Sequence, residues 1–87
     1  MNTKNLVPLK VSGCDKGMRV VLINKGYQPR KNNPVINTPY QCLGTIIIVF
    51  KDFVRVLWDN ESTNSYKDND LALVENDKQY LDIWNSI

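Results

Sequence analysis

The segment that most constrains the fold of this 87-residue chain is a strand–turn–strand pattern over residues 54–66. Val54 to Trp58 is rich in β-branched and aromatic residues, a polar stretch follows, and Asn64 to Tyr66 ends on an aromatic residue. Asn and Asp between two such runs favour a tight turn, because their short side chains hydrogen-bond to nearby backbone. A short apolar run over residues 71–74 then predicts a closing strand.

Two further runs of β-branched residues, 18–23 and 43–50, predict two more strands upstream. Five short strands joined by turns in so short a chain predict a mainly β fold, a small SH3-like barrel over residues 16–75. A chain of this length buries only a modest core, so we expect residues 1–87 to form a single domain. Trp58, at a strand end, is predicted to fill that core rather than to offer a stacking surface.

The predicted strands on either side of Lys51-Asp52 form a hairpin. With a two-residue turn, Val49 lies opposite Val54 and Ile47 lies opposite Val56, on one apolar face. The opposite face is also mostly apolar, whereas a sheet with one face in water alternates apolar and polar residues. The pattern therefore predicts that something covers the second face.

A long loop is predicted over residues 24–41, after the first strand. It contains three prolines, each of which removes a backbone donor and favours extended backbone in the residue before it. Loops of this length in small domains usually carry function. The aromatic and basic residues suited to contact a ligand are Tyr27, Arg30, Lys31 and Tyr40 in this loop, and Tyr66 on the strand after the polar turn.

The C-terminal residues 76–87 predict a short helix with Asn76 or Asp77 as its N-cap. Its apolar side, which includes Trp84, either packs on the barrel or forms a contact between two copies, because so short a helix is marginal alone. Both a monomer and a homodimer therefore remain open.

The composition excludes most catalytic chemistry. There is no histidine, which removes Ser-His-Asp and Cys-His catalysis, and the four glycines are scattered rather than gathered in a phosphate loop. Two separated cysteines, Cys14 and Cys42, make neither a disulfide framework nor a zinc site, and Cys42 is expected to be a small core residue. The acids at 68, 70, 75 and 77 are expected to lie in a solvated loop. We therefore expect no enzyme activity, cofactor or metal.

Hydropathy predicts a cytoplasmic protein without a membrane partner. The longest apolar run, Thr45 to Phe50, is much shorter than the roughly 18 residues of a membrane span. The N-terminal residues contain no apolar stretch of the length that a signal peptide needs.

Charge is unevenly distributed along the chain. Residues 1–50 carry seven Lys and Arg against one acid, and residues 51–87 carry four against eight. Either the two halves pair with each other within the domain, or the basic half faces phosphates or an acidic protein. In the phosphate alternative, Lys25, Arg30 and Lys31 contact RNA or DNA backbone and Tyr27 stacks on a base.

Residues 17–74 resemble a known family in their second half. Trp58-Asp59-Asn60-Glu61, Asn64-Ser65-Tyr66-Lys67 and Asp70-Leu71-Ala72-Leu73 are similar to the W-D-N-G, N-x-Y-R and D-L-x-L pattern of the Mind-bomb/HERC-type domain. The resemblance implies an SH3-like barrel that binds protein ligands. Glu61 stands where that family has glycine, so the turn must accept a side chain there. The loop replaces the tryptophan-rich segment of the family.

The small format, with Asn33-Pro34-Val35 ahead of the predicted hairpin, is also similar to small proteins of large tailed bacteriophages. That resemblance implies an accessory role directed at a host, in the host cytoplasm. The sequence thus predicts a non-enzymatic module that binds a host protein or peptide in a groove between the loop and the strand ends. The alternative is an RNA- or DNA-binding protein that uses its basic N-terminal half.

Overall fold

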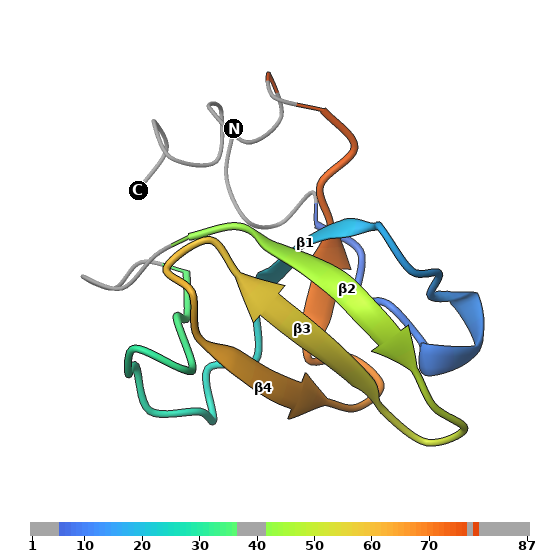
Figure 1. The fold of residues 1–87 in the computed structure, drawn as a ribbon, viewed down its shortest axis with the longest axis horizontal. Helices are drawn as coiled ribbons and strands as arrows, with labels where there is room; N and C mark the ends of the chain where they lie inside the picture. Colours follow the sequence, from blue (N-terminus) through green and yellow to red (C-terminus); the bar gives the residue numbers. More distant parts are fainter. Residues whose placement is uncertain (1–5, 37–41, 77, 79–87) are drawn as a thin grey trace.

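The computed structural model describes residues 6–36, 42–76 and 78, and these form a mainly β structure (Figure 1). All five predicted strands are present and form one antiparallel sheet in the order β4-β3-β2-β1-β5. The elements are η2, a single 3₁₀ turn (Val11–Gly13), β1 (Arg19–Leu22), β2 (Gly44–Val49), β3 (Val54–Trp58), β4 (Thr63–Tyr66) and β5 (Leu71–Leu73).

The sheet curls but stays open. β1 and β5 lie behind β2, β3 and β4 in Figure 1, and β4 and β5 are the two edges of the sheet. The described part of the predicted loop, residues 24–36, reaches both edges: Asn33 accepts a hydrogen bond from Asn64 of β4, and Tyr27 donates one to Asp70 just before β5. The loop therefore connects β4 to the residue before β5 through side-chain hydrogen bonds.

The register of the β2–β3 hairpin agrees with the prediction at the turn and departs from it further along. Val49 lies opposite Val54 as predicted, but Ile46 rather than Ile47 lies opposite Val56. The register shifts between Ile46 and Ile48, which marks a β-bulge. The prediction was wrong here because consecutive isoleucines carry no alternation to fix the register, and the bulge lets Ile46 reach the core.

The core lies on the inner side of this curled sheet, where Trp58 is almost fully buried, as predicted. Gly44 lies directly opposite Trp58, and a Cβ there would lie 2.6 Å from Trp58 Cε3 and 2.4 Å from Val56 Cγ1. Glycine at the start of β2 therefore makes room for the indole. The largest fully buried side chains of the core are Val20, Leu22, Pro34, Ile46, Val54, Val56, Trp58, Tyr66 and Leu71.

A second apolar cluster covers the other face of β1. Val21 packs there with Ala72 of β5 and with Leu43, which precedes β2. Because β1 buries both of its faces, its sequence is a continuous apolar run from Val20 to Leu22 rather than an alternating one.

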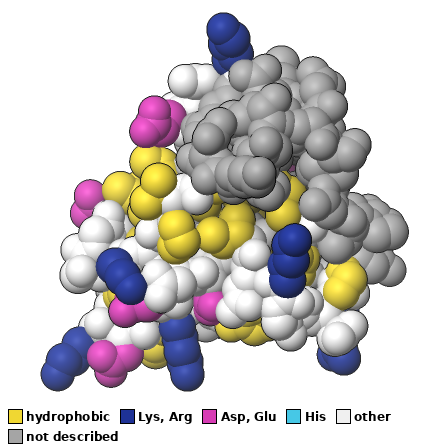
Figure 2. Space-filling view, turned by 180° about the vertical axis from the view of Figure 1, so that it is seen from behind, with side chains coloured by type: hydrophobic (Ala, Val, Ile, Leu, Met, Phe, Trp, Pro, Cys, Tyr) yellow, Lys and Arg dark blue, Asp and Glu magenta, His cyan; other side chains and the backbone are white. Residues whose placement is uncertain are grey.

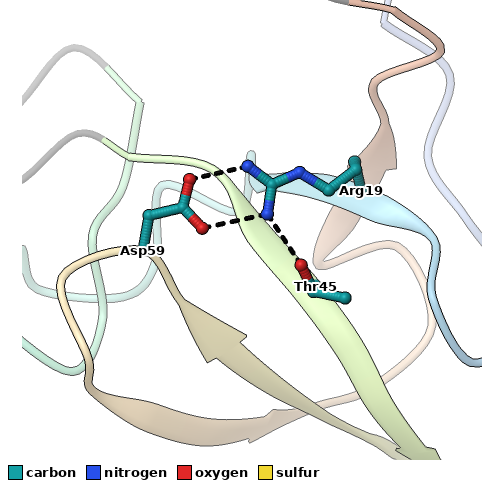
Figure 3. Close-up of polar contacts among 3 residues, drawn as sticks. All are labelled: Arg19, Thr45 and Asp59. Carbon is teal, nitrogen blue, oxygen red and sulfur yellow. Dashed lines mark hydrogen bonds and ion pairs between the residues drawn. The ribbon is translucent and has the colours of Figure 1, made fainter.

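Charges from the two halves of the chain meet on the outer face of the sheet (Figure 3). The guanidinium of Arg19 donates to both carboxylate oxygens of Asp59, over 2.9 and 2.6 Å, and to the hydroxyl of Thr45 over 2.7 Å. This fork joins β1 and β2 to the turn after β3. Both charged side chains are more than a third exposed, so the ion pair adds little to stability.

Both cysteines are free thiols. Cys14 is buried and belongs to the core cluster. Cys42, predicted to be a small core residue, is only half-buried and packs against that cluster from outside. The predicted C-terminal helix over 76–87, with Trp84, lies outside the described residues apart from Asn76 and Lys78. In the described ranges, no helix has the length and apolar character to cross a membrane.

Candidate binding surface

The buried carboxylate of Asp70 fixes the start of the 24–36 loop. Asp70 is only 5% exposed and accepts hydrogen bonds from Asn24 Nδ2 (2.8 Å), the Tyr27 hydroxyl (2.8 Å) and the Lys67 backbone N–H (2.9 Å). The expectation of a solvated acidic loop is therefore wrong for Asp70, which is enclosed by three donors, two from the loop and one from the Lys67 backbone. It holds for Asp68 and Glu75, which are exposed.

Tyr66 joins the same loop to the core. Its hydroxyl accepts a hydrogen bond from Trp58 Nε1 (3.0 Å) and lies 2.8 Å from Asn33 Oδ1, to which it donates. The ring of Tyr27 meets that of Tyr66 edge to face, with centroids 5.7 Å apart. Burial raises the pKa of Tyr66, and burial together with the bond to Asp70 raises the pKa of Tyr27 to about 12. Both phenols are therefore neutral donors at physiological pH.

The middle of the loop is held to the turn between β3 and β4. The carbonyl of Lys31 accepts hydrogen bonds from Asn60 Nδ2 (2.6 Å) and Ser62 Oγ (2.5 Å). Arg30 and Asn33 bond to each other through their backbones and close a tight turn. The side chains of Arg30 and Lys31 are exposed, while the backbone that carries them is fixed.

The turn itself is a three-residue hairpin loop. The Glu61 N–H bonds to the Trp58 carbonyl, and the Trp58 N–H bonds to the Ser62 carbonyl. Glu61 adopts a left-handed conformation (φ 72°), which is what a type I turn followed by a bulge requires and what glycine adopts without strain. Asn60 acts in this turn as predicted, with its Oδ1 accepting from the Ser62 N–H. The side chain of Asp59 differs from the prediction, because its carboxylate accepts from the Arg19 guanidinium rather than from nearby backbone.

A hollow of about 350 Å³ lies beside the end of β4. Tyr27 contributes to it from the loop and Phe53 from the β2–β3 turn, just before β3. The hydrogen bonds of Asp70 and Tyr66 fix the loop side, so the hollow is formed before any ligand binds. Its lining residues are Tyr27, Asp52, Phe53, Ser65, Tyr66 and Lys67.

Exposed apolar side chains lie along the β2–β3 hairpin, and one of them, Phe53, lines this hollow. At the turn, Phe50 and Phe53 stack with ring centroids 4.4 Å apart and remain 42% and 36% exposed. We call the exposed apolar set of this hairpin the hairpin patch; its members are Ile48, Val49, Phe50, Phe53 and Leu57. The sequence did not mark these as ligand contacts, although the missing alternation around Lys51-Asp52 was the signal that could have found them.

The predicted ligand-contact residues occupy different positions in the structure. Tyr27 and Tyr66 both line the hollow, but Tyr66 is fully buried and reaches it only as part of the floor. Arg30 and Lys31 lie on the exposed turn of the loop, outside the hollow lining. Tyr40 lies outside the described residues. Contact of these residues with a ligand stays a prediction.

Basic side chains do not gather into one patch on the face seen in Figure 2. There the Lys and Arg side chains stand apart, with neutral and acidic side chains between them. Lys25, predicted to contact phosphate, is exposed, as are Arg30 and Lys31. A dispersed arrangement gives a weaker attraction for a nucleic-acid backbone than a continuous stripe of cations.

Among the described residues, no group of three or more Cys, Asp or Glu side chains is arranged to hold a metal ion. Burial raises the pKa of the Cys14 and Cys42 thiols, which keeps both protonated and weakly nucleophilic at neutral pH. No family model matches the chain, and neither curated proteins nor solved structures give a match.

Proposed function

We propose that this protein is a non-enzymatic binding module, an SH3-like barrel with a C-terminal helix, that takes a segment of a protein or peptide in the hollow beside the loop. The observation that carries the proposal is the hollow itself, lined by Tyr27, Phe53 and Tyr66. Aromatic rings give large contact areas with few rotatable bonds, so they supply binding energy at low entropic cost.

The rigidity of the loop side supports the same proposal. Tyr27 is held by Asp70, and Tyr66 is held by Trp58 and Asn33, so neither ring must be ordered when a ligand arrives. A site that is already ordered retains more of its contact energy as affinity. The exposed Phe50–Phe53 stack extends the apolar surface beyond the hollow.

The non-enzymatic character rests on the chemistry of the residues. The chain contains no histidine, and its two described thiols have raised pKa values. The buried carboxylate of Asp70 is occupied by three donors, so its oxygens serve the fold. We further propose, from the resemblance to small phage proteins, that the partner is a host protein met in the host cytoplasm.

Affinity purification from host cytoplasm tests the proposal, with each sample divided into nuclease-treated and untreated halves. We expect a discrete protein that survives nuclease, is lost with Phe53→Ser and is retained with Val7→Ser. Val7 is the matched control because it is an exposed apolar residue that does not line the hollow.

Two results would overturn the proposal. Recovery of RNA or DNA, with all proteins lost on nuclease treatment, would assign the protein to nucleic-acid binding through Lys25, Arg30 and Lys31. Equal loss of the partner with Phe53→Ser and Val7→Ser would show that the hollow does not select it. Circular dichroism of both variants checks that they are folded.

A further inference from the structure

The two edges of the sheet differ in how their backbone groups are covered. At the β5 edge, Pro8 forms a bridge with Ala72, and the Leu9 N–H bonds to the Leu71 carbonyl over 2.8 Å. The Leu9 carbonyl in turn accepts from the Asn69 N–H. The N-terminal segment therefore occupies this edge and blocks further pairing.

The β4 edge presents backbone groups outward at Thr63 and Ser65. Backbone hydrogen bonds in an antiparallel pair alternate, and the Trp58 N–H bonds to the Ser62 carbonyl at the start of the ladder. Alternation then directs the backbone of Asn64 and Tyr66 toward β3, and that of Thr63 and Ser65 away from it. The Ser65 N–H confirms this direction, since it bonds to the side-chain oxygen of Asn64 over 2.8 Å rather than to β3.

The hollow runs along this same edge. Three consecutive residues, Ser65, Tyr66 and Lys67, line it, together with Phe53 from the β2–β3 turn and Tyr27 from the loop. A chain that lay beside β4 would therefore have aromatic rings within reach on its inner side. The apolar hollow and the outward backbone groups belong to one continuous surface.

Charge at the edge indicates which side chains such a chain would carry. Arg55 lies across β4, donating to Thr63 Oγ1 over 3.0 Å and to Ser65 Oγ over 3.4 Å, and Lys67 lines the hollow. Asp52 is the one acidic residue of the lining, so Arg55 and Lys67 give this edge one more positive than negative charge. An acidic side chain is favoured on the outer side and an apolar one on the inner side.

We infer that the partner segment binds by strand addition: an extended peptide with alternating apolar and acidic side chains pairs with the β4 edge through Thr63 and Ser65. This inference rests on the proposed function and specifies its binding mode. The peptide backbone displaces the Asn64 side chain from the Ser65 N–H, and one apolar side chain enters the hollow. Backbone hydrogen bonds supply affinity, and the hollow supplies selectivity, as in other edge-strand complexes.

A displayed library of random linear peptides, selected on the full chain, supplies a probe that can then be synthesised. We expect Ser65→Pro to weaken binding of that peptide by about tenfold or more, because proline removes the outward donor. Edge strands accept proline where the N–H faces outward, so the β3–β4 ladder persists. The control is Val7→Ser, at an exposed residue that neither lines the hollow nor belongs to the β4 edge, and it should bind the peptide as the wild type does.

Backbone amide exchange in the wild-type complex gives a second readout that does not depend on a variant folding. Strand addition slows exchange at Ser65 and Thr63 when the peptide binds. Strand addition is wrong, while the proposed function stands, if the peptide binds the wild type and Phe53→Ser abolishes this binding, but neither other test responds. In that case the amides of Thr63 and Ser65 exchange as fast with peptide as without it, and Ser65→Pro binds with wild-type affinity. If no linear peptide is selected, both are overturned.

Discussion

Two of the aromatic pairs among the described residues, Trp58–Tyr66 and Phe50–Phe53, differ sharply in burial. Trp58 and Tyr66 meet edge to face across β3 and β4, with centroids 5.7 Å apart, and are almost completely buried. Phe50 and Phe53 stack across the β2–β3 turn at 4.4 Å and remain about two-fifths exposed. The aromatic side chains with a polar group, Trp58 and Tyr66, are thus buried, and the purely apolar phenylalanines are exposed. Phenylalanine is usually the more buried of these residue types.

Hydrogen bonding explains why the first pair can be buried, whereas the second pair has no polar side-chain group to satisfy. Trp58 Nε1–H donates to the Tyr66 hydroxyl, which in turn donates to Asn33 Oδ1, so neither buried polar group is left without a partner. Among the described residues, the Phe50–Phe53 pair is only partly covered. The buried pair therefore stabilises the domain, and the exposed pair is available for binding.

The largest expected effect is the difference in stability between truncating the buried pair and truncating the exposed pair. Trp58→Ala should lower the free energy of unfolding by about 3–5 kcal/mol, because it opens a cavity in the core and leaves Tyr66 without its donor. Phe53→Ala should cost less than about 1 kcal/mol, as expected for a largely solvated side chain. Urea unfolding followed by circular dichroism measures both. Similar losses for the two variants would remove the distinction between the pairs.

Gly44→Ala tests how closely the buried pair is packed. The new Cβ would lie within 2.6 Å of both Val56 and Trp58, so we expect a loss of about 3 kcal/mol from forced displacement of the core. Gly13→Ala is the matched control, since nothing lies within 4 Å of its added Cβ. Thermal unfolding compares the two. If Gly44→Ala left the unfolding temperature unchanged, the indole would not occupy this position in solution.

Much of the fold was predictable from the sequence because short β-branched runs were separated by strong turn residues. The strands on either side of Lys51-Asp52 and Asp59-Asn60 formed where local preference placed them. The register at Ile46 was not predictable, because adjacent isoleucines offer the core several equivalent choices. Whether the sheet closes was not predictable either, since local strand patterns do not determine whether the two edge strands, β4 and β5, pair with each other.

The candidate site was predictable only in part. Tyr27 was identified from its loop, but its position depends on Asp70, which lies 43 residues further along the chain. No local pattern distinguishes this buried acid from exposed Asp68. Phe53 was assigned to an apolar face that something covers, and only the structure shows it exposed beside a hollow.

Glu61→Gly tests the turn that connects β3 and β4, the two strands that carry the buried pair. Glu61 has a φ of 72°, a conformation that costs a residue with a Cβ about 1 kcal/mol, so glycine should raise the free energy of unfolding by up to about that amount. Asn69→Gly is the control, because Asn69 has a similar φ and asparagine tolerates it better. A loss of stability with Glu61→Gly would contradict this account of the turn.

The smallest effect is confined to alkaline pH and concerns Tyr27, which connects the core to the hollow. Its pKa is raised from 10 to about 12, so the folded state favours the protonated phenol. That contribution is complete below pH 10 and is lost as pH rises through about 12. Stability should therefore fall over this range in the wild type, and less steeply in Tyr27→Phe. The difference in phenolate absorbance between the two proteins isolates Tyr27. Titration near its ordinary pKa would mean that the phenol is neither buried nor bonded to Asp70 in solution.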